Sequence, residues 1–345
     1  MKLKQKFYNV LILFSLFLLF LFLHKTKYDT VDISESLKIA ISNLKDNQQI
    51  VVFDSKNPFN FYDILNNLDN VSNQEVFGVL TYPSIKRDKY PLIMGVAGSL
   101  GWSDHHYGYL NRYLDAGIAT LALHSFESRG VASTVGEQVS ATIPMIVHDA
   151  YMALAALSSK DDIDITKVGI TGWSLGGGVS LFTAWKPIQE KISPEFQFAA
   201  HLPFYPPCIA EPKELEFTGA PIHILIGELD NWVPAAPCVE MIESLKLEDY
   251  NANITVYPNS HHSFDRAMDV KTIDHAYSLT DCRLTLSNTG VVRTKDYNFP
   301  LSNSTLQKIG LYFCADRGPS LGGNKKARDL SRVFSLKFME EHLLD

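Results

Sequence analysis

Short apolar runs alternate with amphipathic stretches from residue 74 to the C-terminus. Apolar runs rich in β-branched and aromatic residues predict strands at 76–82, 90–96, 118–124, 168–171, 198–204, 222–226 and 254–257. Apolar residues that recur at three- and four-residue spacing predict helices at 106–116, 143–158, 175–185, 237–247 and 325–344. This alternation is typical of the α/β class, in which a mainly parallel sheet is covered by helices on both faces.

Two stretches lack this alternation. Residues 24–73 are polar and rich in asparagine, and residues 266–310 show little periodicity of any kind. We therefore expect a spacer and lead-in at 28–73, followed by a single α/β domain at 74–345 that carries an insertion at 266–310.

The first 27 residues have the pattern of an export signal. Lys2, Lys4 and Lys6 precede an unusually apolar run at 10–23, which is the layout of a secretory signal. No small-residue cleavage site follows, and the apolar stretch at 7–23 reaches the lower length limit of a membrane-spanning helix. An uncleaved signal-anchor is favoured over a cleaved signal, and both over a buried core helix. The body of the protein is expected outside the cytoplasm, either membrane-anchored or secreted or periplasmic.

Composition and charge exclude several classes of protein. The chain has 31 Lys and Arg against 38 Asp and Glu, and the resulting net charge of −7 argues against a nucleic-acid partner. A mean hydropathy of −0.02 excludes a polytopic membrane protein, so membrane contact is expected through the N-terminal segment only. The hydrophobic fraction of 46% excludes a disordered chain. The oligomeric state stays open.

Four cysteines are present, and in an exported protein an even number suggests disulfides. Cys208 and Cys238 follow neighbouring strands of the predicted sheet, so they should lie at the same edge and pair. Cys282 and Cys314 bracket the aperiodic insertion, which needs a tether. The histidine pairs 105–106 and 261–262 are adjacent residues, which cannot easily share a tetrahedral metal ion, so we expect no metal site.

Residues 172–176, Gly-Trp-Ser-Leu-Gly, match the G-x-S-x-G motif that presents a nucleophilic serine on a sharp turn. The motif follows the predicted strand 168–171 and opens the predicted helix 175–185, which is the context that the motif requires. Ser174 is therefore the candidate nucleophile. The alternative is a glycine-rich turn with a serine that takes no part in chemistry.

A nucleophilic serine needs a base and an acid that orients the base, in the chain order Ser, acid, His. Asp230 follows the strand 222–226 and is the natural acid, with Glu228 as a weaker candidate. His261 and His262 follow the strand 254–257, and one of the two should be the base.

With these residues in place, the sequence resembles the α/β-hydrolase fold and, within it, the dienelactone hydrolase family. The resemblance spans about 82–264 and the C-terminal helix, and it implies that His262, two residues before an aromatic residue, is the base. Two departures are evident. The nucleophile is Ser174 where dienelactone hydrolases proper have cysteine, and Gly95-Val96 stands where the family has His-Gly. The resemblance rests on Gly172-Trp173-Ser174-Leu175-Gly176-Gly177, Gly227-Glu228-Leu229-Asp230 with Val233-Pro234, His262-Ser263-Phe264, Ser125-Phe126 with Arg129-Gly130, and Phe204-Tyr205-Pro206.

The fold also assigns expected roles around the triad. The backbone N–H of Leu175 and one from the turn after 90–96 should form the oxyanion hole, and matching Gly95-Val96 to His-Gly places the second donor at Ala97. Arg129 follows a strand at the ligand-binding edge and is a candidate partner for a substrate carboxylate, although a loop-stabilising role is equally open. Trp173 is a candidate pocket residue, with simple packing as the alternative.

These features predict a serine hydrolase that acts on small carboxylic esters without a cofactor. A non-catalytic binding or scaffold protein with the hydrolase fold is one alternative, and a peptidase or acyltransferase with the same triad is another. Only residues 186–194 offer a small excursion near the site, and the insertion 266–310 is the one segment long enough to cover it. An open site would favour small soluble esters over long-chain lipids.

Overall fold

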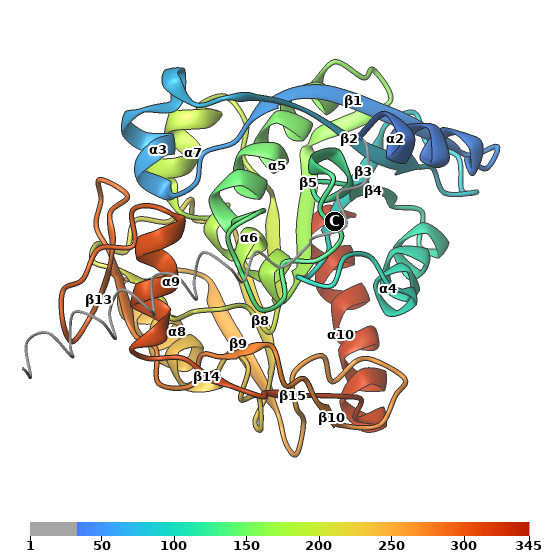
Figure 1. Cartoon of the computed structure of the whole chain (residues 1–345). Coiled ribbons are helices and arrows are strands. Elements are labelled where there is room, and N and C mark those ends of the chain that lie inside the picture. Colours follow the sequence, from blue (N-terminus) through green and yellow to red (C-terminus); the bar gives the residue numbers. More distant parts are fainter. Residues whose placement is uncertain (1–32, 345) are drawn as a thin grey trace, which may run out of the picture. The chain divides into compact units, whose positions relative to one another are not determined.

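The structure, a computed structural model, describes residues 33–344 of the chain, and its centre is an eight-stranded sheet (Figure 1). The strand order is β1-β2-β4-β3-β5-β6-β8-β9, in which β1 and β2 are antiparallel and β4 to β9 run parallel. The α/β prediction is confirmed. The strands are β1 (Gln48–Lys56), β2 (Asn73–Thr81), β3 (Tyr90–Val96), β4 (Ala119–Leu123), β5 (Ile163–Trp173), β6 (Ala200–Phe204), β8 (Ile222–Gly227) and β9 (Ala252–Tyr257).

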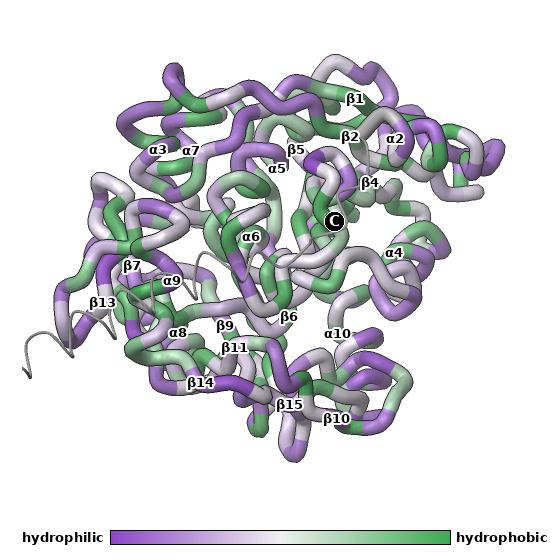
Figure 2. Tube along the Cα trace, in the orientation of Figure 1, coloured by the Kyte–Doolittle hydropathy of each residue, from purple (hydrophilic) through white to green (hydrophobic). Residues whose placement is uncertain are grey.

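Helices cover both faces of this sheet. The helices α4 and α10 pack against each other and against the middle strands, whereas α5 and α6 pack together on the opposite face (Figure 1). Figure 2 shows the corresponding change from purple on peripheral segments such as β14 to green along parts of α6. The helices are α2 (Ile33–Ser42), α3 (Phe61–Asn66), α4 (Asp104–Asp115), α5 (Ile143–Ser158), α6 (Leu175–Phe182), α7 (Lys186–Ile192), α8 (Ala235–Leu247), α9 (Ser304–Tyr312) and α10 (Lys325–Leu343).

The middle strands have no solvent-facing side. Every residue of β3, β4 and β6 is buried, which is the signature of a parallel sheet with helices on both faces. The carboxyl ends of these strands meet at one edge, where the loops that follow β3, β5, β8 and β9 converge. This edge is where such sheets bind ligands.

The lead-in expected at 28–73 contributes to the sheet itself. The strand β1 pairs with β2 along its whole length, from Gln48 opposite Thr81 to Lys56 opposite Asn73. The folded unit therefore starts earlier than residue 74. The alternating burial of β1 shows it as an edge strand with one covered face.

The insertion consists of very short elements held by a disulfide. Its strand β12 pairs with β13 and also with β7, which lies outside the insertion. Leu284, Leu301 and Leu311 form a small apolar cluster with Ile209 beside the Cys282–Cys314 bond. The remaining strands are β7 (Ala210–Pro212), β10 (Lys271–Thr272), β11 (Tyr277–Ser278), β12 (Leu284–Leu286), β13 (Val292–Thr294), β14 (Asp316–Arg317) and β15 (Ser320–Leu321).

Both disulfides expected from the sequence are present, with Cα atoms 5.0 Å apart in Cys208–Cys238 and 4.8 Å apart in Cys282–Cys314. The N-terminal segment 1–27 lies outside the described residues. Within residues 33–344, no helix is both long enough and apolar enough to cross a membrane.

Candidate active site

Ser174 occupies a strained turn between β5 and α6. Its φ of 56° and ψ of −115° lie in a region that residues with a side chain rarely adopt. The flanking glycines are required by space: a Cβ on Gly172 would lie 2.0 Å from the carbonyl oxygen of Gly176, and one on Gly176 would lie 2.2 Å from that of Val96. The G-x-S-x-G pattern therefore has a direct steric cause here.

The structure brings Ser174, His262 and Asp230 into one hydrogen-bonded chain. Nε2 of His262 lies 2.9 Å from Oγ of Ser174, and Nδ1 of His262 lies 2.7 Å from Oδ2 of Asp230. The carboxylate can only accept, so Nδ1–H donates to Asp230 and Nε2 is left to accept from the serine hydroxyl. Asp230 and His262 are buried, which keeps this chain of contacts out of bulk water.

The acid is fixed by its own loop. Oδ1 of Asp230 accepts hydrogen bonds from the backbone N–H groups of Trp232 and Val233, at 3.0 and 2.9 Å, which leaves Oδ2 for the histidine. Glu228, the weaker candidate, is exposed and accepts from the backbone N–H of Asn259. His261 points elsewhere, with Nδ1 2.8 Å from Oγ of Ser320.

Aromatic rings hold the imidazole of His262 from two sides. Tyr205 approaches edge-on with ring centroids 4.8 Å apart, and Trp232 lies 5.0 Å away. The Tyr205 hydroxyl donates to Oδ1 of the buried Asp265, and burial raises the pKa of Tyr205 well above its usual value. The Tyr205 hydroxyl therefore stays protonated and donates to Asp265. The imidazole of His262 packs against the rings of Tyr205 and Trp232.

The turn after β3 approaches Ser174, and its residues are the candidates for the second oxyanion donor. Ala97 does not line either cavity at Ser174 and instead faces a separate small pocket with Trp102 and Phe126. Ser99 lines both cavities at Ser174. In the described part of the chain, the backbone N–H groups of Ala97, Ser99 and Leu175 all lack a backbone acceptor, so Ala97 and Ser99 both stay candidates for the second oxyanion donor beside Leu175.

Gly98 makes this approach possible. A Cβ at this position would lie 2.9 Å from the carbonyl oxygen of Trp173 and 3.2 Å from Cβ of Ser174. The small residues Ala97, Gly98 and Ser99 were the available sequence signal, and the close approach at Gly98 shows which of them lets the turn reach Ser174.

Arg129 is a structural residue and does not face the site. Its guanidinium donates to both carboxylate oxygens of Asp149, at 2.6 and 2.9 Å, and also to Asn57 and to the carbonyl of Ser125. Its side chain is 4% exposed and lines neither cavity at Ser174. The expectation that Arg129 binds a substrate carboxylate is therefore wrong, because all three nitrogens of its guanidinium group already donate to acceptors within the protein.

Trp173 lies beneath the nucleophile. It is 1% exposed, stacks on Phe204 with centroids 5.5 Å apart, and lies 4.5 Å from the ring of His106. Burial lowers the pKa of His106 well below its usual value, so this histidine stays neutral. Of the two cavities that meet at Ser174, Trp173 lines only the smaller one. Its main role is to pack beneath the turn that carries Ser174.

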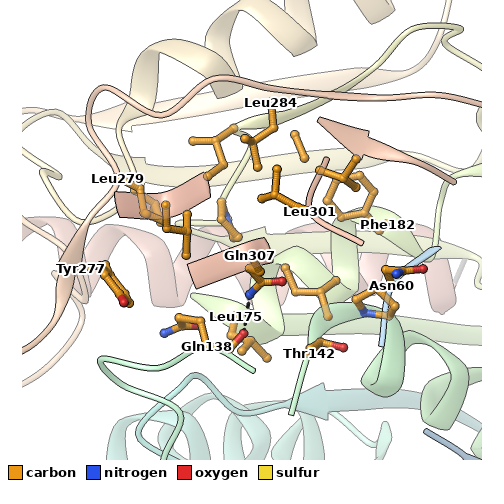
Figure 3. A pocket seen from close by; sticks show the side chains of 18 of the residues that line it. Asn60, Gln138, Thr142, Leu175, Phe182, Tyr277, Leu279, Leu284, Leu301 and Gln307 are labelled. Carbon is orange, nitrogen blue, oxygen red and sulfur yellow. Dashed lines mark hydrogen bonds between the residues drawn. The ribbon is translucent and has the colours of Figure 1, made fainter. Parts of the chain in front are cut away.

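Two cavities meet at Ser174. The larger has a volume of about 180 Å³ and is mainly apolar, and its wall includes Leu279, Leu284 and Leu301 of the insertion (Figure 3) together with Leu311 just after it. The smaller has a volume of about 20 Å³ and a more polar lining. The insertion 266–310 therefore contributes to the wall of the larger cavity, so the site is less open than the sequence led us to expect.

Several site residues escaped the sequence analysis. Arg266 lines the smaller cavity with His262, and Gln138 and Gln307 line the larger one. They come from segments without a recognisable motif. Among residues 33–344, no group of three or more His, Cys, Asp or Glu side chains is placed to hold a metal ion.

Comparison with known proteins identifies the family that the chain is similar to. Residues 123–280 match the dienelactone hydrolase family. Over 221 residues, 60% of this chain and 80% of the other, the sequence is 25% identical to a Yersinia pestis protein to which carboxymethylenebutenolidase activity is ascribed.

Solved structures show the same fold. A dienelactone hydrolase-like promiscuous phosphotriesterase from metagenomic libraries superimposes with a TM-score of 0.51 at 14% identity, covering 86% of this chain and 99% of the other. A structure named m3DLH gives a TM-score of 0.53, with the same identity and coverage. The chain is thus similar in sequence to the dienelactone hydrolase family and has the α/β-hydrolase fold.

Proposed function

We propose that the protein hydrolyses carboxylic esters through an acyl-enzyme on Ser174. The observation that carries this proposal is the continuous chain of contacts from Ser174 Oγ through His262 to Asp230, at 2.9 and 2.7 Å. A serine hydroxyl is unreactive at neutral pH unless a neighbouring base takes its proton, and His262 Nε2 is within reach to do so. Asp230 fixes the tautomer that leaves Nε2 free to accept.

In the first step, Oγ of Ser174 attacks the ester carbonyl carbon as its proton passes to His262 Nε2. The carbonyl oxygen becomes an oxyanion, for which the proposed donors are the N–H group of Leu175 and that of Ser99 or Ala97, since none of the three has a backbone acceptor. The proton on Nε2 then passes to the alkoxide as the C–O bond breaks, which releases the alcohol and leaves the acyl group on Ser174.

Water completes the cycle by the same route. His262 takes a proton from a water molecule, whose oxygen attacks the acyl carbon, and returns that proton to Ser174 Oγ as the acyl–serine bond breaks. The products are the carboxylic acid and the regenerated hydroxyl. These reaction steps use side chains and backbone groups of the chain together with one water molecule.

Export is the second part of the proposal. Two disulfides in a chain of 345 residues support an oxidising compartment, because cytosolic thiols are kept reduced. The basic and apolar N-terminal segment supports the same location. The partner expected is a small-molecule ester, with membrane contact through that segment only.

A fluorophosphonate probe tests the catalytic role. The wild-type protein should be labelled stoichiometrically on Ser174, and Ser174→Ala should lose both labelling and ester turnover. His261→Asn, next to the proposed base but directed at Ser320, is the matched control and should retain both. A folded protein that ignores the probe would favour a binding or scaffold protein instead.

A further inference from the structure

The larger cavity is built to hold hydrocarbon. Its roof comes from Leu284 and Leu301 of the insertion (Figure 3), with Leu311 just after it, each no more than 7% exposed, and its wall also includes Phe61 on α3 and Phe182 on α6. The Cys282–Cys314 bond closes the segment that carries these leucines. Because the roof is tethered by this disulfide and its side chains are apolar, the cavity offers an apolar surface next to Ser174.

Polar side chains on the wall are already partnered within the protein. Gln307 donates to the backbone carbonyl of Gln138, Thr142 donates to that of Phe59, and Asn60 donates to that of Ser302. Each of these bonds uses one donor of its side chain, and most of the remaining wall is apolar. The cavity therefore selects by shape and by apolar surface.

The position of the base decides which half of an ester enters this cavity. His262 must deliver its proton to the departing alkoxide, so the alcohol has to lie on the side of His262. His262 lines the smaller cavity and not the larger one. The acyl group, which remains on Ser174, is thereby directed into the larger cavity.

We propose that the substrates are esters of a medium-length, unsubstituted acyl chain with a small alcohol, a conclusion that rests on the proposed ester hydrolysis. A cavity of about 150 Å³ holds a six-carbon ring, so about 180 Å³ accommodates roughly six to eight carbons beyond the carbonyl. Each buried methylene should raise kcat/KM by about fourfold until the cavity is full. The preference then falls for longer chains.

Two isomeric esters test the assignment directly. Methyl octanoate and heptyl acetate have the same atoms, but seven carbons lie on the acyl side in one and on the alcohol side in the other. We expect kcat/KM for methyl octanoate to exceed that for heptyl acetate by at least about 30-fold, given about fourfold per buried methylene. Equal values, or a preference for heptyl acetate, would overturn the acyl assignment while leaving ester hydrolysis intact.

Cavity variants provide a second, independent measurement. Ala210→Leu adds volume to the wall and should move the optimum in a series of methyl esters to shorter acyl chains, whereas Leu301→Ala should move it to longer ones. Lys308→Leu, on the exposed side of α9, is the control and should leave the optimum unchanged. Circular dichroism reports that each variant is folded. An optimum that does not move in either variant contradicts the proposal.

Failure of the underlying function would look different. If no methyl ester is hydrolysed and the fluorophosphonate does not label Ser174, the hydrolase proposal falls and takes the acyl pocket with it. If labelling and methyl acetate turnover are normal but chain length has no effect, only the acyl pocket is overturned.

Discussion

The side-chain amide of Gln307, on α9, donates a hydrogen bond to the backbone carbonyl of Gln138, 2.6 Å away on the opposite wall of the larger cavity. Gln138 has a φ of 56°, a conformation that costs free energy in a residue with a side chain, and its N–H donates to the carbonyl of Thr134. The hydrogen bond from Gln307 to Gln138 thus connects α9, which lies at the roof of the larger cavity, to the opposite wall near Ser174.

Replacing Gln307 by leucine removes this bond and keeps the approximate volume. The lost bond contributes about 1 kcal/mol, so local opening of α9 should become about fivefold more frequent. Hydrogen exchange followed by mass spectrometry should show faster exchange in α9 and in residues 134–138. Lys308→Leu on the same helix serves as control, and unchanged protection in Gln307→Leu would mean that the bond does not hold the roof.

Asp230→Asn should abolish most turnover while the fold stays intact. The N–H groups of Trp232 and Val233 require an acceptor, so the asparagine oxygen will face them and its NH₂ group will face His262. That NH₂ group forces the imidazole to carry its proton on Nε2, where it can no longer accept from Ser174. The loss in kcat should be about 10⁴-fold, as found for this tautomer change in serine proteases.

The matched variant is Glu228→Gln, two residues away and exposed. It should retain kcat within about twofold, since exposed substitutions away from special contacts have small effects. Steady-state kinetics with methyl octanoate and circular dichroism on both variants decide the matter. Comparable losses in the two would return Glu228 to consideration as the orienting acid.

Arg129→Met should affect stability and not substrate affinity. Removing the guanidinium leaves Asp149, whose side chain is 0% exposed, as an uncompensated buried charge next to Ser55. Loss of one partner of a buried pair costs about 3–5 kcal/mol in the free energy of unfolding. Urea titration measures this loss, and KM of the remaining folded protein should be unchanged. A raised KM at normal stability would restore a substrate-binding role.

The sequence predicted the interior of the fold best. The bounds of β3 and α5 match the prediction residue for residue, because a fully buried strand reads as an unbroken apolar run and α5 has a strong helical period. Edge elements such as β1 were missed, since only one of its faces is covered. The strands of the insertion could not be predicted because each has only two or three residues, too few to show a periodic pattern of apolar positions.

The candidate site was predictable where it depends on order along the chain. Ser174, Asp230 and His262 each follow a strand, and the topology of the sheet brings those strand ends together. Arg129 was misread because its partner Asp149 comes from a different helix, and no local pattern reveals that pairing. The second oxyanion donor depends on which residue of the turn after β3 approaches Ser174. Tertiary contacts decide this, and no local sequence pattern shows it.

Gly98→Ala should slow turnover because it pushes the turn after β3, which carries a proposed oxyanion donor, away from Ser174. The new methyl group would lie 2.9 Å from a backbone oxygen of Trp173, and backbone cannot yield as a flexible side chain can. Displacing one oxyanion donor costs about 10²–10³ in kcat. Gly108→Ala, in α4, meets only the end of Arg332 at 3.4 Å and should keep full activity. Equal activity in the two variants would contradict the assignment of this turn.

The protein should lose stability as the pH falls from about 6.5 towards 4, and His201 should account for a defined part of the loss. His201 is fully buried in β6, and burial lowers its pKa to about 4, whereas an unfolded histidine titrates near 6.5. Between these values the unfolded chain binds a proton that the folded chain does not. The contribution is therefore complete above about pH 6.5 and is lost as the pH falls through the folded pKa.

His201→Leu isolates this contribution from those of His105 and His148, whose pKa values burial also lowers to about 4. The free energy of unfolding in urea, measured from pH 7.5 to 4.5, should fall by about 2 kcal/mol more in the wild-type protein than in the variant, because one proton is taken up on unfolding in one and not in the other. The variant will differ in absolute stability, since it loses the hydrogen bond from Nδ1 to the carbonyl of Ser180. Only the pH dependence carries the prediction, and parallel curves for the two proteins would show that His201 is protonated equally in the folded and unfolded states.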